Sequence, residues 1–192
     1  MVKALKDIAE LQLGYSFRTG AELVLESDLK VIQLKNLDDS GLVSLKDVLS
    51  VDAFDSSDKY IVQRHDLLFK TRGVALGCSY VDIESSNLIF AAPLIRIRVK
   101  DDRGICPEYL YWYLNSIDAK RYIANHLRSG TSIFITKENL ENMLVELPTI
   151  AMQKEVVDIF NMFEQEKKLS KNYFQKKEYY IQNKLSEIVK GE

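Results

Sequence analysis

The chain has 192 residues, of which 46% are hydrophobic and 28% are charged, and its net charge is −2. This composition supports a folded core and excludes an intrinsically disordered chain. It also excludes a protein that binds nucleic acid through a strong overall positive charge. No apolar run approaches the roughly 18 residues that a membrane-spanning helix needs.

The first residues and the two cysteines indicate the cellular setting. Residues 1–10 mix polar and apolar side chains and show no signal peptide. Cys78 and Cys106 fit neither a metal-binding nor a redox spacing. We therefore expect a cytoplasmic protein without membrane contact, with two reduced thiols and no metal site.

Residues 1–148 mix patterns typical of helices and strands, which predicts one α+β globular domain. The apolar spacing of residues 3–13 predicts a helix. Short strands are expected at 31–34 and 145–147. The run Leu-Leu-Phe at 67–69 predicts a buried strand.

The clearest strand pattern lies at residues 88–100. There Ile95, Ile97 and Val99 alternate with Arg96, Arg98 and Lys100. The basic side chains therefore share one face of the strand. We interpret this face as solvent-exposed, with DNA contact as the alternative.

Three helices are predicted in the later part of the domain. Pro107 favours the first position of a helix that continues to Leu114. A second helix is expected at 116–127, and Thr136 is suited to cap a third. The Ser-Gly-Thr sequence at 129–131 forms a loop between the last two.

Residues 149–192 follow a single helical pattern, without Gly or Pro before Gly191. About 40 residues of helix would extend roughly 60 Å. One apolar stripe runs along this helix and lapses across residues 164–168. Because residues 1–148 leave no helix free to cover the stripe, we expect another chain to supply one.

Few residues point to catalysis. His65 and His126 occupy no metal-binding spacing, and we interpret both as structural or exposed. Gly73 and Gly77 lie four positions apart, which is not the spacing of a phosphate-binding or dinucleotide-binding loop. Signatures of serine hydrolases, zinc proteases and methyltransferases are absent from the sequence, so we expect no enzymatic activity.

Two short motifs in the first part of the chain resemble the recognition domain of type I restriction–modification specificity proteins. Residues 66–69 and 71–73, followed by Gly77, are similar to that family's Gly-Asp-Ile-Leu … Arg-Gly … Gly. Residues 105–114 are similar to its Ile-x-Pro-x-Tyr-Leu-x-Tyr-x-Leu.

Two later motifs continue the resemblance in the same order. Gly130-Thr131, followed by Leu140, is similar to the family's late Gly-Thr … Leu loop. Residues 147–157 are similar to Leu-Pro-Pro-Leu-x-Glu-Gln-x-x-Ile-Val, which begins its long helix. The resemblance covers about residues 4–190. Three positions depart from the family pattern, namely His65 for Gly, Thr149 for Pro and Met152 for Glu.

The resemblance implies a specificity subunit without catalytic residues. Such a subunit binds double-stranded DNA, recognises half of a bipartite site, and binds type I methyltransferase subunits and, in restriction complexes, a restriction subunit. No cofactor is expected in this chain, because S-adenosylmethionine belongs on the methyltransferase.

Family members carry two recognition domains, each followed by a long helix, and the two helices pack antiparallel. This chain has one of each, so we expect a homodimer through an antiparallel coiled coil of residues 150–190, which would recognise a palindromic split site. The predicted dimer seam consists of Val156, Phe160, Phe163, Phe174, Ile181, Leu185 and Ile188.

Loops of the domain are expected to contact DNA, because guanidinium, amide and hydroxyl groups bind phosphates and base edges. We expect Asn36 to suit adenine and an arginine to suit guanine, whereas Asp66, Gly73 and Gly77 are expected to shape a turn. The candidate DNA-contacting residues are Tyr15, Ser16, Phe17, Arg18, Lys35, Asn36, Lys70, Thr71, Arg72, Arg128, Ser129, Gly130, Thr131, Ser132 and Lys137.

Three alternatives stay open at this point. Residues 1–149 contain 18 Lys/Arg and 21 Asp/Glu, a charge of −3 that favours a protein-interaction or scaffold module without DNA binding. The chain is alternatively the recognition fragment of a fused or split methyltransferase, or a truncated half of a longer protein.

Overall fold

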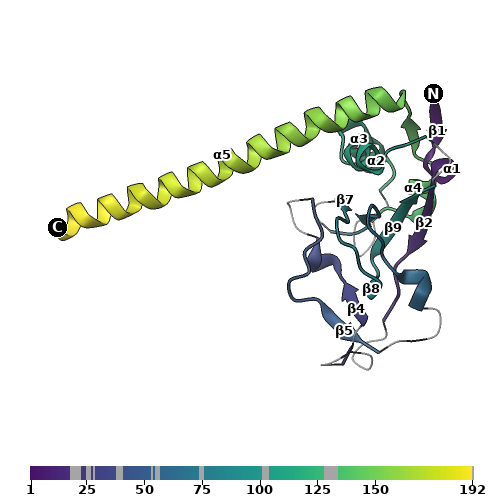
Figure 1. The fold of residues 1–192 in the computed structure, drawn as a ribbon, viewed down its shortest axis with the longest axis horizontal. Helices are drawn as coiled ribbons and strands as arrows, with labels where there is room; N and C mark the ends of the chain where they lie inside the picture. The colour runs from purple at the N-terminus through teal and green to yellow at the C-terminus, as the bar shows by residue number, and fades with distance from the viewer. Residues whose placement is uncertain are drawn as a thin grey trace. The chain divides into compact units, whose positions relative to one another are not determined.

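The computed structural model describes residues 1–17, 23–24, 27, 29–37, 41–52, 54, 57–73, 76–100, 104–127 and 134–191. Two compact units are present, Met1–Gln153 and Lys154–Glu192. The first unit is an α+β domain with its strands in three sheets, and the second consists of the greater part of one long helix (Figure 1). This confirms the predicted fold class.

The first four-stranded sheet is antiparallel and has the order β2-β9-β6-β7. Its strands are β2 (Ala9–Leu13), β9 (Leu94–Val99), β6 (Leu67–Lys70) and β7 (Gly77–Tyr80). Leu67, Leu68 and Phe69 of β6 are fully buried, which confirms the buried strand that this apolar run predicted. An interior strand covered on both faces reads as a continuous apolar run rather than an alternating one.

The second four-stranded sheet has the order β3-β5-β4-β8 and contains one parallel pair, β4 with β8. Its strands are β3 (Leu23–Val24), β5 (Leu49–Val51), β4 (Leu29–Ile32) and β8 (Leu88–Phe90). Two short 3-10 helices, η1 (Leu34–Asn36) and η2 (Ser57–Tyr60), flank β5 along the chain. The main hydrophobic cluster draws on both sheets and includes Ile32, Leu68 and Phe90.

The two sheets are joined where the chain leaves β2. The backbone of Gly14 donates to the carbonyl of Leu94, at the start of β9, and Tyr15 donates to Phe90, at the end of β8. A side chain at position 14 would collide with Ala91, because a Cβ there would lie 2.4 Å from the Ala91 carbonyl carbon. Glycine is therefore required for this close approach.

The start of the chain differs from the prediction. Residues 3–13 form the end of β1 (Val2–Ala4), the single-turn α1 (Leu5–Ile8) and β2, instead of one helix. β1 pairs antiparallel with β10 (Leu144–Glu146), near the end of the domain. The prediction failed because pairing with β9 and β10, which lie far along the chain, outweighs local helical spacing.

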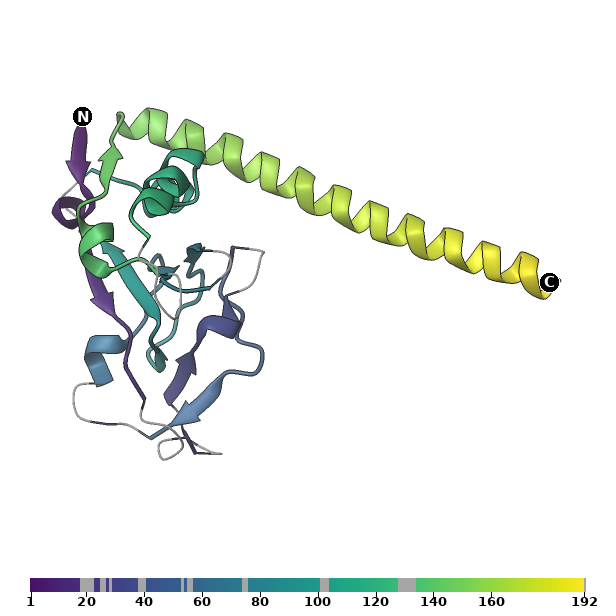
Figure 2. The same cartoon turned by 180° about the vertical axis from the view of Figure 1, so that it is seen from behind.

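The helices of the domain follow the predicted pattern. α2 (Pro107–Leu114) begins with its proline, and α3 (Ile117–Asn125) is capped by the Ser116 hydroxyl, which accepts from the Ala119 amide. α4 (Lys137–Glu141) is capped by Thr136 in the same way. Both views show α2 and α3 at the end of the domain that carries the N-terminus, opposite β4 and β5 (Figures 1 and 2).

The last helix, α5 (Ile150–Lys190), has 41 residues and no interruption. The sequence predicted this helix within one or two residues at each end. Most of its large apolar side chains are exposed, Phe163, Phe174 and Ile188 among them. Exposed apolar surface of this kind is typical of interaction sites.

Candidate nucleic-acid interface

Tyr15 and Phe17 belong to an aromatic cluster. The Tyr15 ring centroid lies 4.2 Å from that of Phe54 and 4.6 Å from that of Phe17, and Tyr60 also contacts Tyr15. Phe17, Phe54 and Tyr60 pack against a buried cluster of the second sheet that contains Val31. Both predicted residues therefore have a packing role here, and each is half-buried.

Asn36 is not available to a base. Its side chain is buried, its Oδ1 accepts from the Gln33 amide, and its Nδ2 donates to the Lys46 carbonyl. This contradicts the predicted adenine contact, because both ends of the amide are bonded within the domain. Lys35, its neighbour in η1, is exposed.

Lys70 and Thr71 are held by the domain as well. The Lys70 ammonium donates to the Leu37 carbonyl, and the Thr71 hydroxyl donates to the Pro93 carbonyl over 2.7 Å. Their hydrogen bonds connect β6 to neighbouring loops. Thr71 also lies in the wall of the pocket described below.

Arg96, the first cation of the basic stripe on β9, is neither solvated nor free to contact DNA. It is buried, donates to the carbonyls of Lys59 and Ile61, and pairs with Glu10. Burial lowers the pKa of the Arg96 guanidinium below its ordinary value. For Arg96 both interpretations of the stripe are wrong, because segments distant in sequence fold over it.

Arg98 and Lys100, the other two cations of the stripe, are half-buried and also bond within the domain. Arg98 forms a two-point ion pair with the buried Asp66, and its pKa is raised, chiefly by the hydrogen bond to that carboxylate. Lys100 donates to the Lys6 carbonyl. The Asp66 of the sequence motif therefore has a structural role, as predicted.

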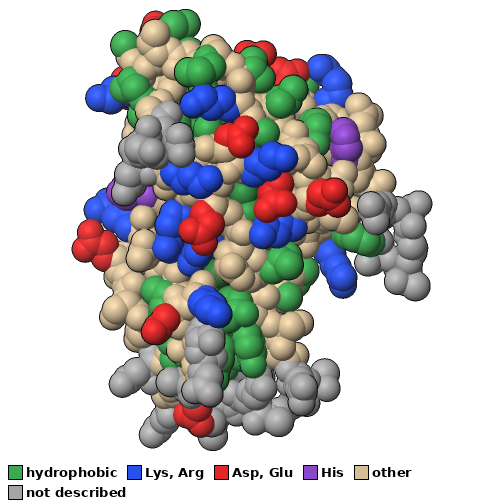
Figure 3. Space-filling model, turned by 90° about the vertical axis from the view of Figure 1, so that its right-hand side faces the viewer, with side chains coloured by type: hydrophobic (Ala, Val, Ile, Leu, Met, Phe, Trp, Pro, Cys, Tyr) green, Lys and Arg blue, Asp and Glu red, His purple; other side chains and the backbone are tan. Residues whose placement is uncertain are grey.

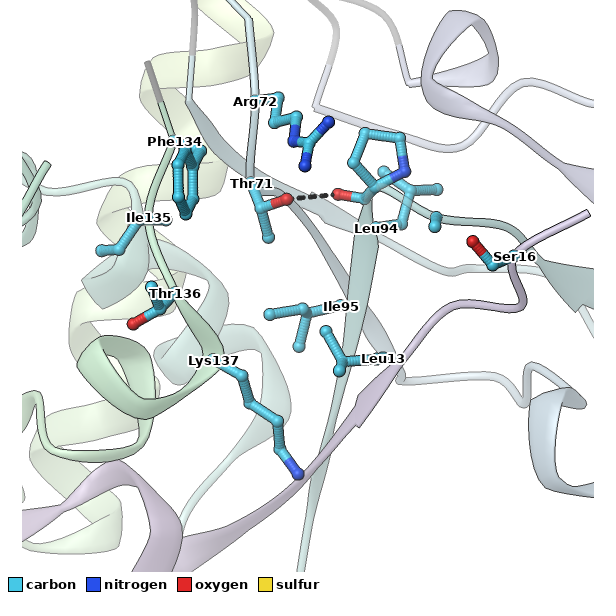
Figure 4. A pocket seen from close by; sticks show the side chains of 12 residues that line it. Leu13, Ser16, Thr71, Arg72, Leu94, Ile95, Phe134, Ile135, Thr136 and Lys137 are labelled. Carbon is cyan, nitrogen blue, oxygen red and sulfur yellow. Dashed lines mark hydrogen bonds between the residues drawn. The ribbon is translucent and has the colours of Figure 1, made fainter. Parts of the chain in front are cut away.

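Four of the predicted residues meet at one pocket. Ser16, Thr71, Arg72 and Lys137 come from three segments that lie far apart in the sequence, and they line a cavity of about 380 Å³ (Figure 4). Leu13, Leu94, Ile95 and Phe134 supply much of the apolar wall. Sequence reasoning missed these wall residues, because only the paired strands bring them beside the polar ones.

Arg72 is oriented by Phe134. The two residues form an antiparallel β-bridge, and the guanidinium carbon of Arg72 lies 5.7 Å from the centroid of the Phe134 ring. The Ile135 amide donates to the Thr71 carbonyl, which ties the same two segments together. A guanidinium against an aromatic face is held in place without losing its N–H donors.

Lys137 enters the pocket from the first turn of α4. Its ammonium lies 3.3 Å from the Glu141 carboxylate, one turn further along the helix. Part of its charge is therefore neutralised. Figure 4 shows Lys137 at one end of the pocket and Arg72 at the other, on the side of Phe134.

Six candidates fall outside the described residues. These are Arg18, Arg128, Ser129, Gly130, Thr131 and Ser132. Residues 128–132 come just before Phe134 in the sequence.

Two motif residues have clear local roles. His65 has a backbone φ of 72°, in the left-handed region that favours glycine, and the family pattern has Gly at this position. Gln153 is fully buried, accepts from the Cys106 amide, and donates to the carbonyls of Gly104 and Pro148. The motif at the start of α5 thus fixes the first turn of that helix to the loop before α2.

Charges on the surface are mixed in sign. On the face in Figure 3, Lys and Arg side chains are interleaved with Asp and Glu. The described residues contain no cluster of three potential metal ligands, and no described helix is long and apolar enough to cross a membrane. Cys78 and Cys106 form no disulfide.

An α+β domain followed by one long helix is thus the class of fold observed. Residues 1–183 match the family model described as type I restriction modification DNA specificity domain, and the chain belongs to this family. No curated protein was found to match the sequence.

Several solved structures share the fold. One is a chain from a study of complex assembly and conformational transition of the type I R-M system, with 16% identity and a TM-score of 0.66. The HsdS subunit from Thermoanaerobacter tengcongensis has 16% identity and a TM-score of 0.65, and the S subunit from M. genitalium has 13% and 0.55. Each match covers 86% of this chain but only 38%, 37% and 39% of the respective relatives.

Proposed function

We propose that this chain is a sequence-specific DNA-binding specificity subunit of a type I restriction–modification system, which recognises one half of a bipartite site. The observation that carries the proposal is the match of residues 1–183 to the DNA specificity domain family. The pocket that gathers Arg72, Lys137 and Ser16 supports it, because these donors suit nucleic acid.

The proposed partners are double-stranded DNA and a type I methyltransferase subunit, with a restriction subunit as a further partner. Residues 1–149 carry a charge of −3, and acidic groups are interleaved with basic ones. The domain alone therefore attracts phosphates weakly. The methyltransferase would supply the remaining attraction, and S-adenosylmethionine would bind there.

Methylation mapping tests this function. The chain is co-expressed in a bacterial host with a type I methyltransferase from the same genome, and methylated bases are mapped across the host chromosome. We expect methylation at one bipartite motif only when both proteins are present. An unchanged methylation pattern when this chain is omitted would contradict the proposal.

A scaffold module without DNA binding is the alternative, favoured by the acidic domain. The two functions differ in salt dependence, because each phosphate contact releases counterions. Binding of a duplex with the mapped motif is measured with the methyltransferase present, in low and in physiological salt. Affinity that falls with salt supports DNA recognition, whereas absence of retention at both supports the scaffold.

We further propose that α5 pairs antiparallel with a second copy of itself. Residues 150–166 contain one lysine and four acidic residues, whereas residues 167–190 contain seven lysines and two glutamates. An antiparallel pair places the acidic half of each helix against the basic half of the other. A parallel pair would place like charges together.

The distribution of apolar residues supports the same arrangement. Phe160, Lys167, Phe174, Ile181 and Ile188 follow at multiples of seven, so the apolar seam is interrupted by charge only near its middle. Antiparallel pairing centred at about residue 170 would set the two apolar stretches opposite one another.

Solution mass and cross-linking test the dimer. Light scattering should give a mass near twice 22.1 kDa. Ser170→Cys should form a disulfide with its own copy, whereas Ile188→Cys should not, because antiparallel helices separate the two ends. Disulfides in both variants would indicate a parallel pair, and a monomeric mass would contradict the homodimer.

Matched variants locate the seam. Phe174→Glu should convert the dimer into a monomer. Tyr179→Glu should not, because Tyr179 lies five residues further and thus about 140° around the helix. Both side chains are mostly exposed, at 65% and 71%. Equal effects of the two changes would contradict the assigned face.

A further inference from the structure

Arg72 differs from the other arginines in the described part of the chain. Arg64, Arg96, Arg98 and Arg121 each lie within 4 Å of a carboxylate oxygen of a described residue. Arg72 forms no such pair, is exposed at the rim of the pocket, and contacts the Phe134 ring. Within the described residues its charge has no carboxylate partner, and the Phe134 ring favours one orientation of the guanidinium.

The charged side chains of the pocket are hydrogen-bond donors. Arg72 and Lys137 have no acceptor atoms. The hydroxyl hydrogens of Thr71 and Thr136 are donated within the domain, to the Pro93 carbonyl and to Asn139 Oδ1, so the side-chain donors left for a ligand are mainly those of Arg72 and Lys137. Such a set matches a ligand that only accepts, as the oxygens of a phosphodiester do.

The shape of the pocket favours a backbone phosphate over a base edge as its ligand. Base edges lie at the floor of grooves about 8 Å deep, and proteins reach them with projecting helices, strands or loops. Arg72 instead lies at the rim of a recess, which suits a group that protrudes from the DNA. Backbone phosphates are those protruding groups.

We propose that Arg72, held against Phe134 at this pocket, binds one backbone phosphate of the target duplex and positions the domain without distinguishing bases, with Lys137 as a second cation at the other end of the pocket (Figure 4). This rests on the proposed function. Arg72 supplies a forked pair of donors, Phe134 orients it, and Lys137 adds a charge that Glu141 partly neutralises.

The test uses Arg72→Gln in the full chain with its methyltransferase. Affinity is measured for a duplex with the mapped motif and for a scrambled duplex, over a range of salt. We expect about tenfold weaker binding to both duplexes and a salt slope reduced by about 0.9, with the methylated motif unchanged. Arg121→Gln, an equal charge change on α3 outside the pocket, should weaken binding less.

Methylphosphonate substitution locates the contact. Neutralising the correct phosphate should weaken wild-type binding and leave Arg72→Gln unaffected. A change of motif at one base in Arg72→Gln would show base recognition and overturn the proposal, as would unchanged affinity. Saturable binding of inorganic phosphate without DNA would indicate a free-anion site instead. A wild-type complex that binds no DNA would overturn the proposed function itself.

Discussion

The carboxylate of Asp66 and the guanidinium of Arg98 form a two-point ion pair, with Nε to Oδ1 and Nη2 to Oδ2 both at 2.7 Å. Asp66 also accepts from the Gln63 amide, and its side chain is only 1% exposed. The pair links the turn before β6 to β9 in the centre of the first sheet. Both oxygens of the Asp66 carboxylate are thus bonded within the fold, and neither is available to a ligand.

Asp66→Ala should lower the free energy of unfolding by about 3–5 kcal/mol, because it leaves a desolvated guanidinium without its partner. Urea denaturation measures this loss. Asp82→Ala removes a carboxylate from Arg64 in a pair that is about half exposed on both sides. That variant should lose much less stability, because water screens an exposed pair, and equal losses would argue against the role given to the buried pair.

Gln153→Ala should destabilise the domain by about 2–4 kcal/mol, because the Cys106 amide and the Gly104 and Pro148 carbonyls lose their partner in a buried site. Thermal unfolding followed by circular dichroism measures the change. Gln165→Ala, at an exposed position of the same helix, should have little effect. A Gln153→Ala protein as stable as wild type would refute the anchoring role.

His65→Gly should be more stable than His65→Ala by about 1 kcal/mol, because alanine keeps the cost of a left-handed backbone and glycine removes it. Both variants lose the contact of the ring with the Tyr80 hydroxyl. Comparing the two therefore isolates the backbone contribution. The reverse order of stability in denaturant titrations would contradict the backbone contribution assigned to position 65.

Alkaline pH should destabilise the domain through Tyr109. Burial raises the pKa of this phenol from 10 to about 12. Since the folded pKa is the higher one, its stabilising contribution is complete below pH 10 and is lost as the pH rises to 12. Tyr109→Phe should lose less stability across this window. Parallel curves of unfolding free energy against pH for the wild type and Tyr109→Phe would contradict the pKa assigned to Tyr109.

Local sequence patterns predicted a helix or strand correctly wherever its formation depends on its own residues. Pro107, Ser116 and Thr136 begin helices where the sequence placed them, and α5 follows from its uninterrupted helical pattern. The apolar run of β6 was sufficient as well. These signals act within one turn or one strand, and here no distant segment overrides them.

The failures all involve partners distant in sequence. Residues 9–13 form a strand because β9 pairs with them, although their spacing fits a helix. The sequence predicts Arg96 and Arg98 on an exposed face. In the structure they bond to Glu10 and Asp66, which lie 86 and 32 positions away in the sequence. The pocket around Arg72 was only half predicted, because Phe134 and Leu13 reach it through tertiary pairing.

The junction between the two sheets at Gly14 and Tyr15 affects how the domain unfolds. Their two amides are bonded to Leu94 and Phe90, and the few residues between these two carry the chain from one sheet to the other. Separating the sheets would break both bonds and open the hydrophobic cluster that the two sheets share, so we expect the sheets to unfold together. The domain should thus behave as a single cooperative foldon, with the slowest amide exchange shared across both sheets.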